Sequence, residues 1–381
     1  MPNNLAIYVH WPFCLSKCPY CDFNSHVSND INENLWQQAY LFQIDKYSEL
    51  LSTSQITSIF FGGGTPSLMP PFIAESIISK IQEISAISSD IEITLEANPT
   101  SIEIGKFIDF KNAGINRVSV GVQALNDIDL KFLGRQHNVK NALNALDTAR
   151  KIFSNYSFDL IYARPGQTVE QWNSELELAL KHASSHISLY QLTIEKGTEF
   201  FNEYRKRKFE LPNEEISAQL YELTNKKLGN ENFEAYEISN YAKKGFESKH
   251  NLTYWNYEDY LGIGPGAHSR INKKAISMIY NPQKYLSLIN QNKNPIQQEI
   301  SLSAKEQLAE MLLMGLRLNK GISWDKIERF SNKSKKEIIK HPQIKNLNNA
   351  EFIEIDENNL KISNKGRVLS NQIIEKIVDC F

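Results

Sequence analysis

Hydrophobic residues in the first half of the chain follow two alternating patterns. Between Leu5 and about Leu192, short β-rich runs recur between longer stretches of amphipathic helical periodicity. This alternation is typical of repeated parallel βα units. Six segments are predicted to be strands: Leu5–His10, Ile56–Phe61, Ile91–Glu96, Asn116–Val122, Phe158–Tyr162 and His186–Leu192.

Several of these runs are almost continuously apolar, as in Ile59–Phe61. Such runs suit strands that are covered on both faces, as in a parallel sheet with outer helices. Six units predict an α/β fold, a partial (β/α)6 barrel whose opening is filled by a ligand or by the rest of the chain. Functional residues are then expected at the carboxyl ends of the strands.

The pattern changes after Glu195. A polar, helix-prone stretch continues to about Gly229, and the aromatic-rich segment Phe233–Tyr260 is not another βα repeat. From Ser301, two helical segments precede two short β-like runs and a final helix, which predicts a small C-terminal helical or winged-helix-like domain. We therefore expect a core at 1–230, a linking region at 231–300 and a C-terminal domain at 301–381.

Composition excludes some classes of partner. The 42 basic and 44 acidic residues give a net charge of -2, which provides no field for binding nucleic acid. The stretch Leu5–Phe13 is too short for a signal-peptide core, and no run approaches the roughly 18 apolar residues of a membrane helix. We expect a cytoplasmic protein without a nucleic-acid partner.

Three of the four cysteines lie close together directly after the first predicted strand. Cys14, Cys18 and Cys21 form a C-x3-C-x2-C triplet, whereas Cys380 stands alone and is interpreted as an incidental thiol. Three thiolates can ligate three irons of a cubane cluster and leave the fourth open. The alternatives are a zinc site completed by His10 or His26, and three incidental thiols. We favour the cluster because structural zinc sites usually show paired C-x2-C spacings.

Glycines and polar residues follow the next predicted strands. Residues 62–66 read GGGTP, where missing Cβ atoms let a ligand approach backbone N–H groups, although such a run alone is more often a turn. Glu96, Gln123 and Asp159 lie at or near strand ends, and Arg135 could pair with a carboxylate. Ordinary capping is the alternative explanation for these polar residues.

The triplet, with the preceding Tyr8-Val-His, resembles the radical S-adenosylmethionine (SAM) superfamily. The resemblance implies one [4Fe-4S] cluster and SAM, with the GGGTP segment holding the methionine end of SAM. Within the superfamily, the chain is similar to the oxygen-independent coproporphyrinogen III oxidase-like family over nearly its whole length. That similarity implies SAM contacts at Tyr8, Tyr20, Gly63, Gly64, Thr65, Glu96, Gln123, Arg135 and Asp159.

This family contains an oxidase and a haem chaperone, and three features favour the chaperone. The cysteine pattern of the oxidase is C-x3-C-x2-C-x-C, with an additional cysteine two residues after the third. In this chain Phe23 occupies that position. The oxidase carries an N-terminal extension, whereas seven residues precede Tyr8. Residues 250–255 read HNLTYW and match the H-N-x-x-Y-W motif associated with haem binding in the chaperone. An oxidative decarboxylation of a porphyrinogen is the alternative function, so the resemblance leaves open whether the protein is an enzyme.

The motif resemblance makes His250 the first candidate for an axial haem ligand, although a lone histidine is more often a hydrogen-bonded side chain. His268, which follows the glycine-rich segment 262–266, is the second candidate. The expected partners are haem and an unidentified haem-acceptor protein, with membrane association left open. One departure from the family pattern is Ala163-Arg164, where Gly-Leu is usual, and it puts the loop after the fifth strand in doubt.

Overall fold

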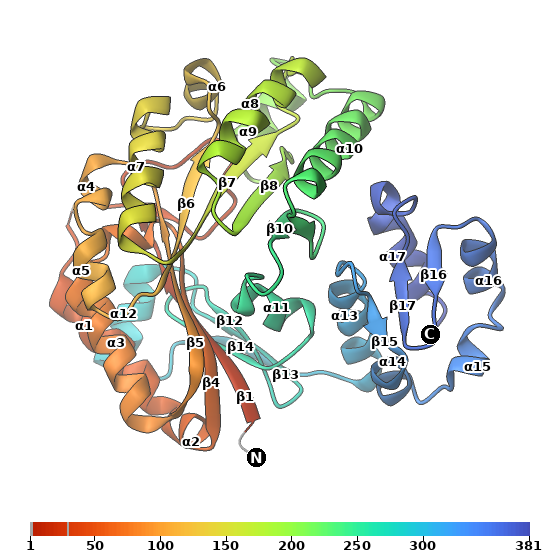
Figure 1. Ribbon diagram of the computed structural model, residues 1–381. Coiled ribbons are helices and arrows are strands. Elements are labelled where there is room, and N and C mark those ends of the chain that lie inside the picture. Colours follow the sequence, from red (N-terminus) through yellow and green to blue (C-terminus); the bar gives the residue numbers. More distant parts are fainter. Residues whose placement is uncertain (1–2, 29) are drawn as a thin grey trace.

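The computed structural model describes residues 3–28 and 30–381. Its centre is a curved sheet with the strand order β14-β13-β12-β11-β1-β4-β5-β6-β7-β8-β10-β9 (Figure 1). The six strands from β1 to β8 in that order pair in parallel and confirm all six predicted strands. They are β1 (Asn3–Trp11), β4 (Ser54–Gly63), β5 (Ala86–Ala97), β6 (Arg117–Gln123), β7 (Asn155–Tyr162) and β8 (His186–Gln191). The α/β fold with a partial (β/α)6 barrel is thereby confirmed.

Helices cover the outer face of these parallel strands (Figure 1). They are α1 (Glu33–Lys46), α2 (Ser48–Ser52), η1 (Pro66–Leu68), α3 (Pro71–Ile84), α4 (Ser101–Ile104), α5 (Phe107–Asn112), α6 (Asp127–Phe132), α7 (Val139–Ile152) and α8 (Val169–His182). Sequence signals set their starts: reciprocal capping boxes open α7 at Asn138 and α8 at Thr168.

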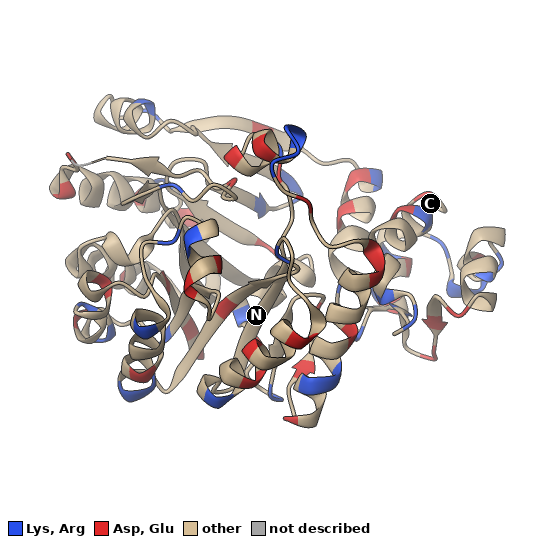
Figure 2. Ribbon diagram, turned by 90° about the horizontal axis from the view of Figure 1, so that it is seen from above, with Lys and Arg blue, Asp and Glu red and all other residues tan. Residues whose placement is uncertain are grey.

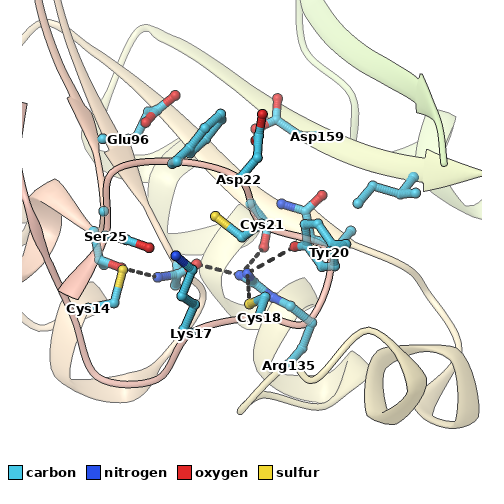
Figure 3. A pocket seen from close by; sticks show the side chains of 18 of the residues that line it. Cys14, Lys17, Cys18, Tyr20, Cys21, Asp22, Ser25, Glu96, Arg135 and Asp159 are labelled. Carbon is cyan, nitrogen blue, oxygen red and sulfur yellow. Dashed lines mark hydrogen bonds between the residues drawn. The ribbon is translucent and has the colours of Figure 1, made fainter. Parts of the chain in front are cut away.

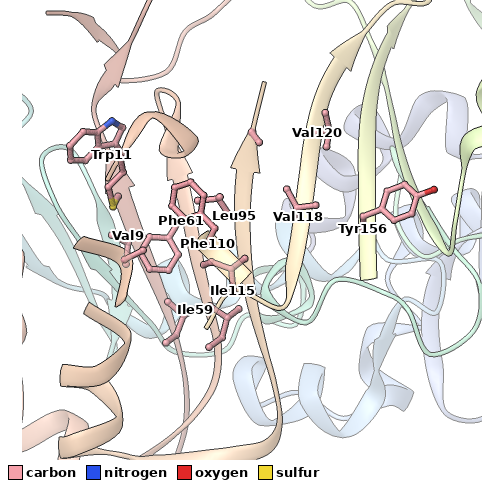
Figure 4. Close-up of a cluster of buried hydrophobic side chains, with 14 of the residues drawn as sticks. Val9, Trp11, Ile59, Phe61, Leu95, Phe110, Ile115, Val118, Val120 and Tyr156 are labelled. Carbon is pink, nitrogen blue, oxygen red and sulfur yellow. The ribbon is translucent and has the colours of Figure 1, made fainter. Parts of the chain in front are cut away.

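The main hydrophobic core lies between the strands and these helices. Figure 4 shows Val9, Ile59, Leu95 and Val118 of successive strands beside Phe110 of α5, and all five are buried. Burying apolar area of this kind stabilises the fold by about 25 cal/mol per Å². The core therefore holds the strands rigid, so that their carboxyl ends can position a site.

Strands beyond the six extend the sheet at both edges. On one side, β11 (Tyr260–Ile263) pairs in parallel with β1, and β12 (His268–Ile271), β13 (Lys274–Met278) and β14 (Ile296–Ser301) follow in antiparallel fashion. On the other side, β10 (Asn240–Ala242) and β9 (Glu234–Ala235) continue from β8. The intervening helices are α9 (Glu199–Arg205), α10 (Glu214–Asn230), α11 (Lys249–Trp255) and α12 (Pro282–Asn290). Residues 231–300 therefore contribute strands to the main sheet, and the domain boundaries at 230 and 300 stay a prediction.

The C-terminal part has its own hydrophobic cluster and a small sheet in the order β15-β17-β16. Its elements are α13 (Ala304–Gly315), β15 (Ile322–Ser323), α14 (Trp324–Ser331), α15 (Lys335–Ile338), α16 (Pro342–Asn349), β16 (Ile353–Ile355), β17 (Asn359–Ile362), η2 (Arg367–Leu369) and α17 (Ser370–Val378). Four helices precede β16 where two were expected, because Asn332, with φ of 54°, ends α14 and two short helices follow.

Basic and acidic residues are interspersed over the ribbon in Figure 2, without a single-sign stripe along one element. This distribution agrees with the nearly balanced charge of the sequence. Among the described residues, no helix combines the length and the apolar character needed to span a membrane.

Candidate functional site

The cysteine triplet lies in a loop that the backbone closes at both ends. The short strands β2 (Phe13–Cys14) and β3 (His26–Val27) pair in parallel, and the N–H of Cys21 donates to the carbonyl of Cys18 at 3.1 Å. The three half-buried thiols line one cavity of about 360 Å³ at the carboxyl ends of the strands (Figure 3). Burial raises the pKa of the Cys14 thiol to about 11.

The GGGTP segment leaves the end of β4 and lies against the cysteine loop. Gly64 N–H donates to the carbonyl of Trp11 at 2.7 Å, and Thr65 N–H donates to that of Phe13 at 2.8 Å. Gly63 has φ of 112°, and a Cβ there would lie 2.6 Å from the His10 ring. The glycines are therefore required for this approach of two backbones. The Thr65 hydroxyl then donates to Sγ of Cys14 at 3.3 Å.

Arg135 reaches the other side of the cysteine loop. Its guanidinium donates to Sγ of Cys18 at 3.5 Å, to the hydroxyl of Tyr20 at 3.4 Å and to the carbonyl of Gly121 at 2.9 Å (Figure 3). It also donates to the side-chain oxygen of Asn98. A fixed positive charge beside a thiol favours the thiolate that a metal cluster requires.

Two carboxyl groups, Glu96 of β5 and Asp159 of β7, lie on the opposite wall of the cavity (Figure 3). Burial, and then repulsion by Asp159, raises the pKa of Glu96 to about 8. Burial likewise raises the pKa of Asp159. Both carboxyl groups face one cavity and have raised pKa values. A ligand with positive charge or hydrogen-bond donors would stabilise their ionised forms.

The cavity brings together eleven of the twelve residues assigned to the cluster and SAM. They are Cys14, Cys18, Cys21, Tyr20, Gly63, Gly64, Thr65, Glu96, Gln123, Arg135 and Asp159. The twelfth, Tyr8, lies apart from this lining, and its hydroxyl hydrogen-bonds with Nδ1 of His10 at 3.0 Å.

Sequence reasoning missed several residues of the lining, among them Asn98, Ser119 and Tyr190. Asn98 links the two halves of the site, because it donates to the hydroxyl of Thr65 at 3.1 Å and accepts from Arg135. Its position directly after β5 was the signal that could have found it. No sequence signal marks Tyr190 as a lining residue, because a tyrosine in an apolar strand is usually a core residue.

A second cavity of about 460 Å³ adjoins the first and shares Phe23, Gly63 and Glu96 with it. Aromatic residues and histidines dominate its wall: Tyr8, His10, Phe60, His250, Tyr254, Tyr260, His268 and Tyr280. Both histidines that the sequence offered as haem ligands therefore border one space.

The two histidines differ in their surroundings. His250 lies on α11 inside the barrel, is 1% exposed and stacks on Phe60. Its Nδ1 hydrogen-bonds with the Ser58 hydroxyl at 2.9 Å and its Nε2 with the Tyr254 hydroxyl at 2.8 Å. Haem ligation by His250 therefore stays a prediction that requires the contact with Tyr254 to break. His268, at the start of β12, is exposed.

The histidines of the zinc alternative are also engaged. His10 Nε2 hydrogen-bonds with the carbonyl of Asn24 at 2.8 Å, and His26 Nε2 with the side-chain oxygen of Asn24 at 2.7 Å. Over residues 3–28 and 30–381, no three histidine, cysteine or acidic side chains are arranged to hold a single metal ion.

The unusual pair after β7 lines neither cavity. Ala163 adopts φ of 57°, a conformation that favours glycine. Arg164 is buried and pairs with the carboxylate of Glu175 through two nitrogens, and with Asp129 at 3.0 Å. The added cation is thus matched by two carboxylates and does not enter the site.

Family profiles and named relatives match most of this chain. The profile of the radical SAM superfamily matches residues 8–179, and that of the HemN C-terminal domain matches residues 302–369. A relative from Danio rerio, named radical S-adenosyl methionine domain-containing protein 1, mitochondrial, is 36% identical over 98% of this chain and 86% of its own. The Bacillus subtilis protein named heme chaperone HemW is 34% identical over 97% of both chains.

Among solved structures, the chain is similar to the coproporphyrinogen III oxidase HemN from Escherichia coli, described as a radical SAM enzyme. The TM-score is 0.83 at 21% identity, covering 99% of this chain and 90% of that one. At this identity the likeness shows the shared fold, including the C-terminal part, and does not decide between related functions.

Proposed function

Because this chain belongs to the radical SAM superfamily, in the family of the HemW proteins, we propose that it is a haem chaperone that carries a [4Fe-4S] cluster and SAM. In this proposal it binds haem and delivers it to an acceptor protein, in the cytoplasm. The observation that carries it is the 34% identity to a protein named as a haem chaperone over almost the whole length of both chains.

The residues of the first cavity fit a cluster and SAM. Cys14, Cys18 and Cys21 would hold three irons, and Arg135 supplies a positive charge beside Cys18. Glu96 and Asp159 offer two carboxyl groups to the ammonium, sulfonium or ribose of SAM. The remaining assigned contacts are Tyr8, Tyr20, Gly63, Gly64, Thr65 and Gln123, and Tyr8 is the one that lies outside the cavity lining.

A cluster held by these three cysteines would supply one electron to SAM. The chain's own groups prepare the site for both. The Thr65 hydroxyl and the Arg135 guanidinium orient the sulfurs of Cys14 and Cys18. The glycines keep the backbone of residues 63 and 64 close to the cysteine loop, which leaves no room for side chains between them. Glu96 takes up or releases a proton as positive charge leaves or enters the cavity.

Phe23 favours the chaperone over the oxidase. It occupies the position of the additional cysteine in the oxidase pattern. Its side chain is 55% exposed and borders both cavities. A phenyl ring provides a flat apolar surface and no thiol chemistry. The oxidase function remains the second candidate because the fold is shared with HemN.

An anaerobic assay separates the two functions. The full-length protein, reconstituted with iron and sulfide, is given SAM, reductant and coproporphyrinogen III, and in parallel is titrated with haem. We expect stoichiometric haem binding and no carbon dioxide or decarboxylated porphyrinogen. Several turnovers of decarboxylation would show that the protein acts as an oxidase and would contradict the chaperone function.

A further inference from the structure

The second cavity has the chemistry of a porphyrin site. Its volume of about 460 Å³ is comparable to that of small-molecule pockets, and its wall is largely aromatic. Phe23 and Tyr280, at 55% and 51% exposure, present large aromatic surfaces at its opening. Exposed aromatic rings that gather at one cavity are typical of a surface that a ligand covers.

Among the histidines of this cavity, His268 is the one with an available ring. His10 and His250 use both ring nitrogens in hydrogen bonds within the barrel. Partial burial, and then Arg270, lowers the pKa of His268 below its ordinary value of 6.5, and no hydrogen bond contributes to that shift. A lowered pKa favours the neutral imidazole, the form that binds iron.

The position of His268 is fixed before any ligand arrives. Gly264 and Gly266, with φ of 103° and 76°, form the turn that leads into β12, and β12 pairs with β13. Asn24 donates to the carbonyls of Pro265 and Tyr280, each at 2.9 Å. One side chain next to Phe23 thereby ties together the loops that carry Phe23, His268 and Tyr280, and such preorganisation lowers the entropic cost of binding.

We propose that haem binds in this second cavity with its iron on the imidazole of His268 and its ring against Phe23 and Tyr280. This rests on the proposed haem-chaperone function and names its site. The H-N-x-x-Y-W helix then forms the inner wall of the site, with His250 held by Ser58 and Tyr254. Because Phe23 and Gly63 border both cavities, bound haem lies beside the cluster and SAM site.

The test uses the full-length, cluster-reconstituted protein and two probes, ferric haem and metal-free protoporphyrin IX. His268→Ala should weaken haem binding at least tenfold and shift the Soret band, because the axial bond is lost. The same variant should bind protoporphyrin IX within twofold of wild type, since that ligand has no iron. Phe23→Ala should weaken both probes about fivefold or more.

Two controls separate a ligand from a structural residue. His341→Asn, in the C-terminal part, keeps an acceptor at a helix start and should leave both titrations unchanged. His250→Gln keeps hydrogen-bonding groups near Ser58 and Tyr254 and should retain the Soret band. Cluster iron should stay at the wild-type level in all four variants.

The outcomes are distinct. An unchanged Soret band and haem affinity in His268→Ala would overturn the proposed site. Loss of the band in His250→Gln alone, with cluster iron intact, would assign the ligand to the motif histidine and leave the chaperone function standing. If the wild-type protein binds no haem, the proposed function itself fails.

Discussion

At the scale of single residues, the first cavity contains carboxyl groups whose surroundings oppose their usual charge state. Glu96 has a pKa of about 8, because burial and Asp159 both favour the neutral acid. Its neighbours Gly63 and Arg117 act in the opposite direction and do not outweigh them. A ligand with positive charge would reverse this balance, so binding and ionisation of Glu96 should be linked.

This linkage gives a prediction for SAM. Because the carboxylate form binds a cation, the affinity of the reconstituted protein for SAM should rise as the pH increases from about 6.5 to 8 and then level off. Glu96→Gln should weaken SAM at least tenfold and remove the pH dependence, as measured by calorimetry. Glu231→Gln, on the surface, serves as the control and should behave like wild type.

Stability provides an independent check on the same variant. Because the pKa of the Glu96 carboxyl is raised in the folded state, this group stabilises the folded protein at pH values below its ordinary pKa of 4.5. This contribution is lost as the pH rises to about 8. Removing the charge should therefore stabilise the SAM-free protein at pH 8 by about 1 to 3 kcal/mol. A Glu96→Gln protein that binds SAM normally would show that this carboxyl is not a ligand.

Sequence predicted the residues of the first cavity better than those of the second. The cysteine spacing, the glycine run and polar residues at strand ends are local signals, and the parallel sheet brings them together. The family resemblance groups Tyr8 with them, but Tyr8 lines the second cavity. The confinement of His250 could not be predicted, because its partner Ser58 is 192 positions away in the chain.

At the scale of elements, helix α11 lies inside the barrel, and Glu92 of β5 caps its N-terminus. The Glu92 carboxylate accepts from the Ser248 hydroxyl at 3.1 Å and from the N–H groups of Lys249 and His250 at 3.3 and 3.2 Å. Glu92 is buried, and Arg117 lies 3.8 Å away. A side chain from a distant strand thus caps the helix that carries the H-N-x-x-Y-W motif.

Removing this cap should destabilise the whole barrel. Glu92→Ala leaves buried donors and the Arg117 charge without a partner, so we expect a loss of about 3 kcal/mol in the free energy of unfolding. Glu299→Ala, which breaks the exposed pair with Lys274, should cost less than about 1 kcal/mol. Equal losses in the two variants, measured by urea denaturation, would contradict the capping role.

The short edge elements show where sequence patterns stop being informative. Five of the six residues of β14 are exposed and four are polar, so they carry no alternating pattern, although β14 pairs with β13 over most of its length. By contrast, the central parts of the six parallel strands are buried on both faces, and their apolar runs located all six, although β5 begins five residues before its predicted start. Burial therefore made the barrel strands predictable. The edge strand β14 was not predictable, because it depends on pairing with β13 and not on burial.

At the scale of the whole molecule, the C-terminal part docks beside the second cavity. Arg270 of β12 donates to Glu310 of α13 at 3.0 and 2.8 Å, and the Tyr257 hydroxyl donates to the same carboxylate at 2.8 Å. The Arg317 guanidinium lies 5.1 Å from the ring centroid of Trp255, the last residue of the motif. The motif helix is therefore held by the barrel at one end and by the C-terminal part at the other.

Glu310 should control this docking. Burial opposes its ionisation, but hydrogen bonds from Arg270 and Tyr257 outweigh burial and lower its pKa. The contact is therefore present at neutral pH and weakens as the pH falls below the ordinary value of 4.5. Glu310→Ala should lower the stability by about 1 to 3 kcal/mol and speed hydrogen exchange in α13.

The exposed pair of Glu351 and Lys365 offers a matched comparison within the C-terminal part. Glu351→Ala should leave exchange in α13 unchanged, because surface pairs contribute about 0 to 1 kcal/mol. Faster exchange in both variants would mean that the C-terminal part is destabilised as a unit, and that the contact with β12 is not what holds α13.

The cavity of the three cysteines is the assigned site of the cluster, and electron paramagnetic resonance of the reduced protein tests that assignment most directly. The anaerobically reconstituted protein should show one [4Fe-4S] cluster whose spectrum changes when SAM is added, because three thiolates leave one iron open. Alanine at Cys14, Cys18 or Cys21 should abolish the signal, and Cys380→Ala should keep it. A spectrum that SAM does not alter, or a cluster that survives in the first three variants, would contradict the assignment.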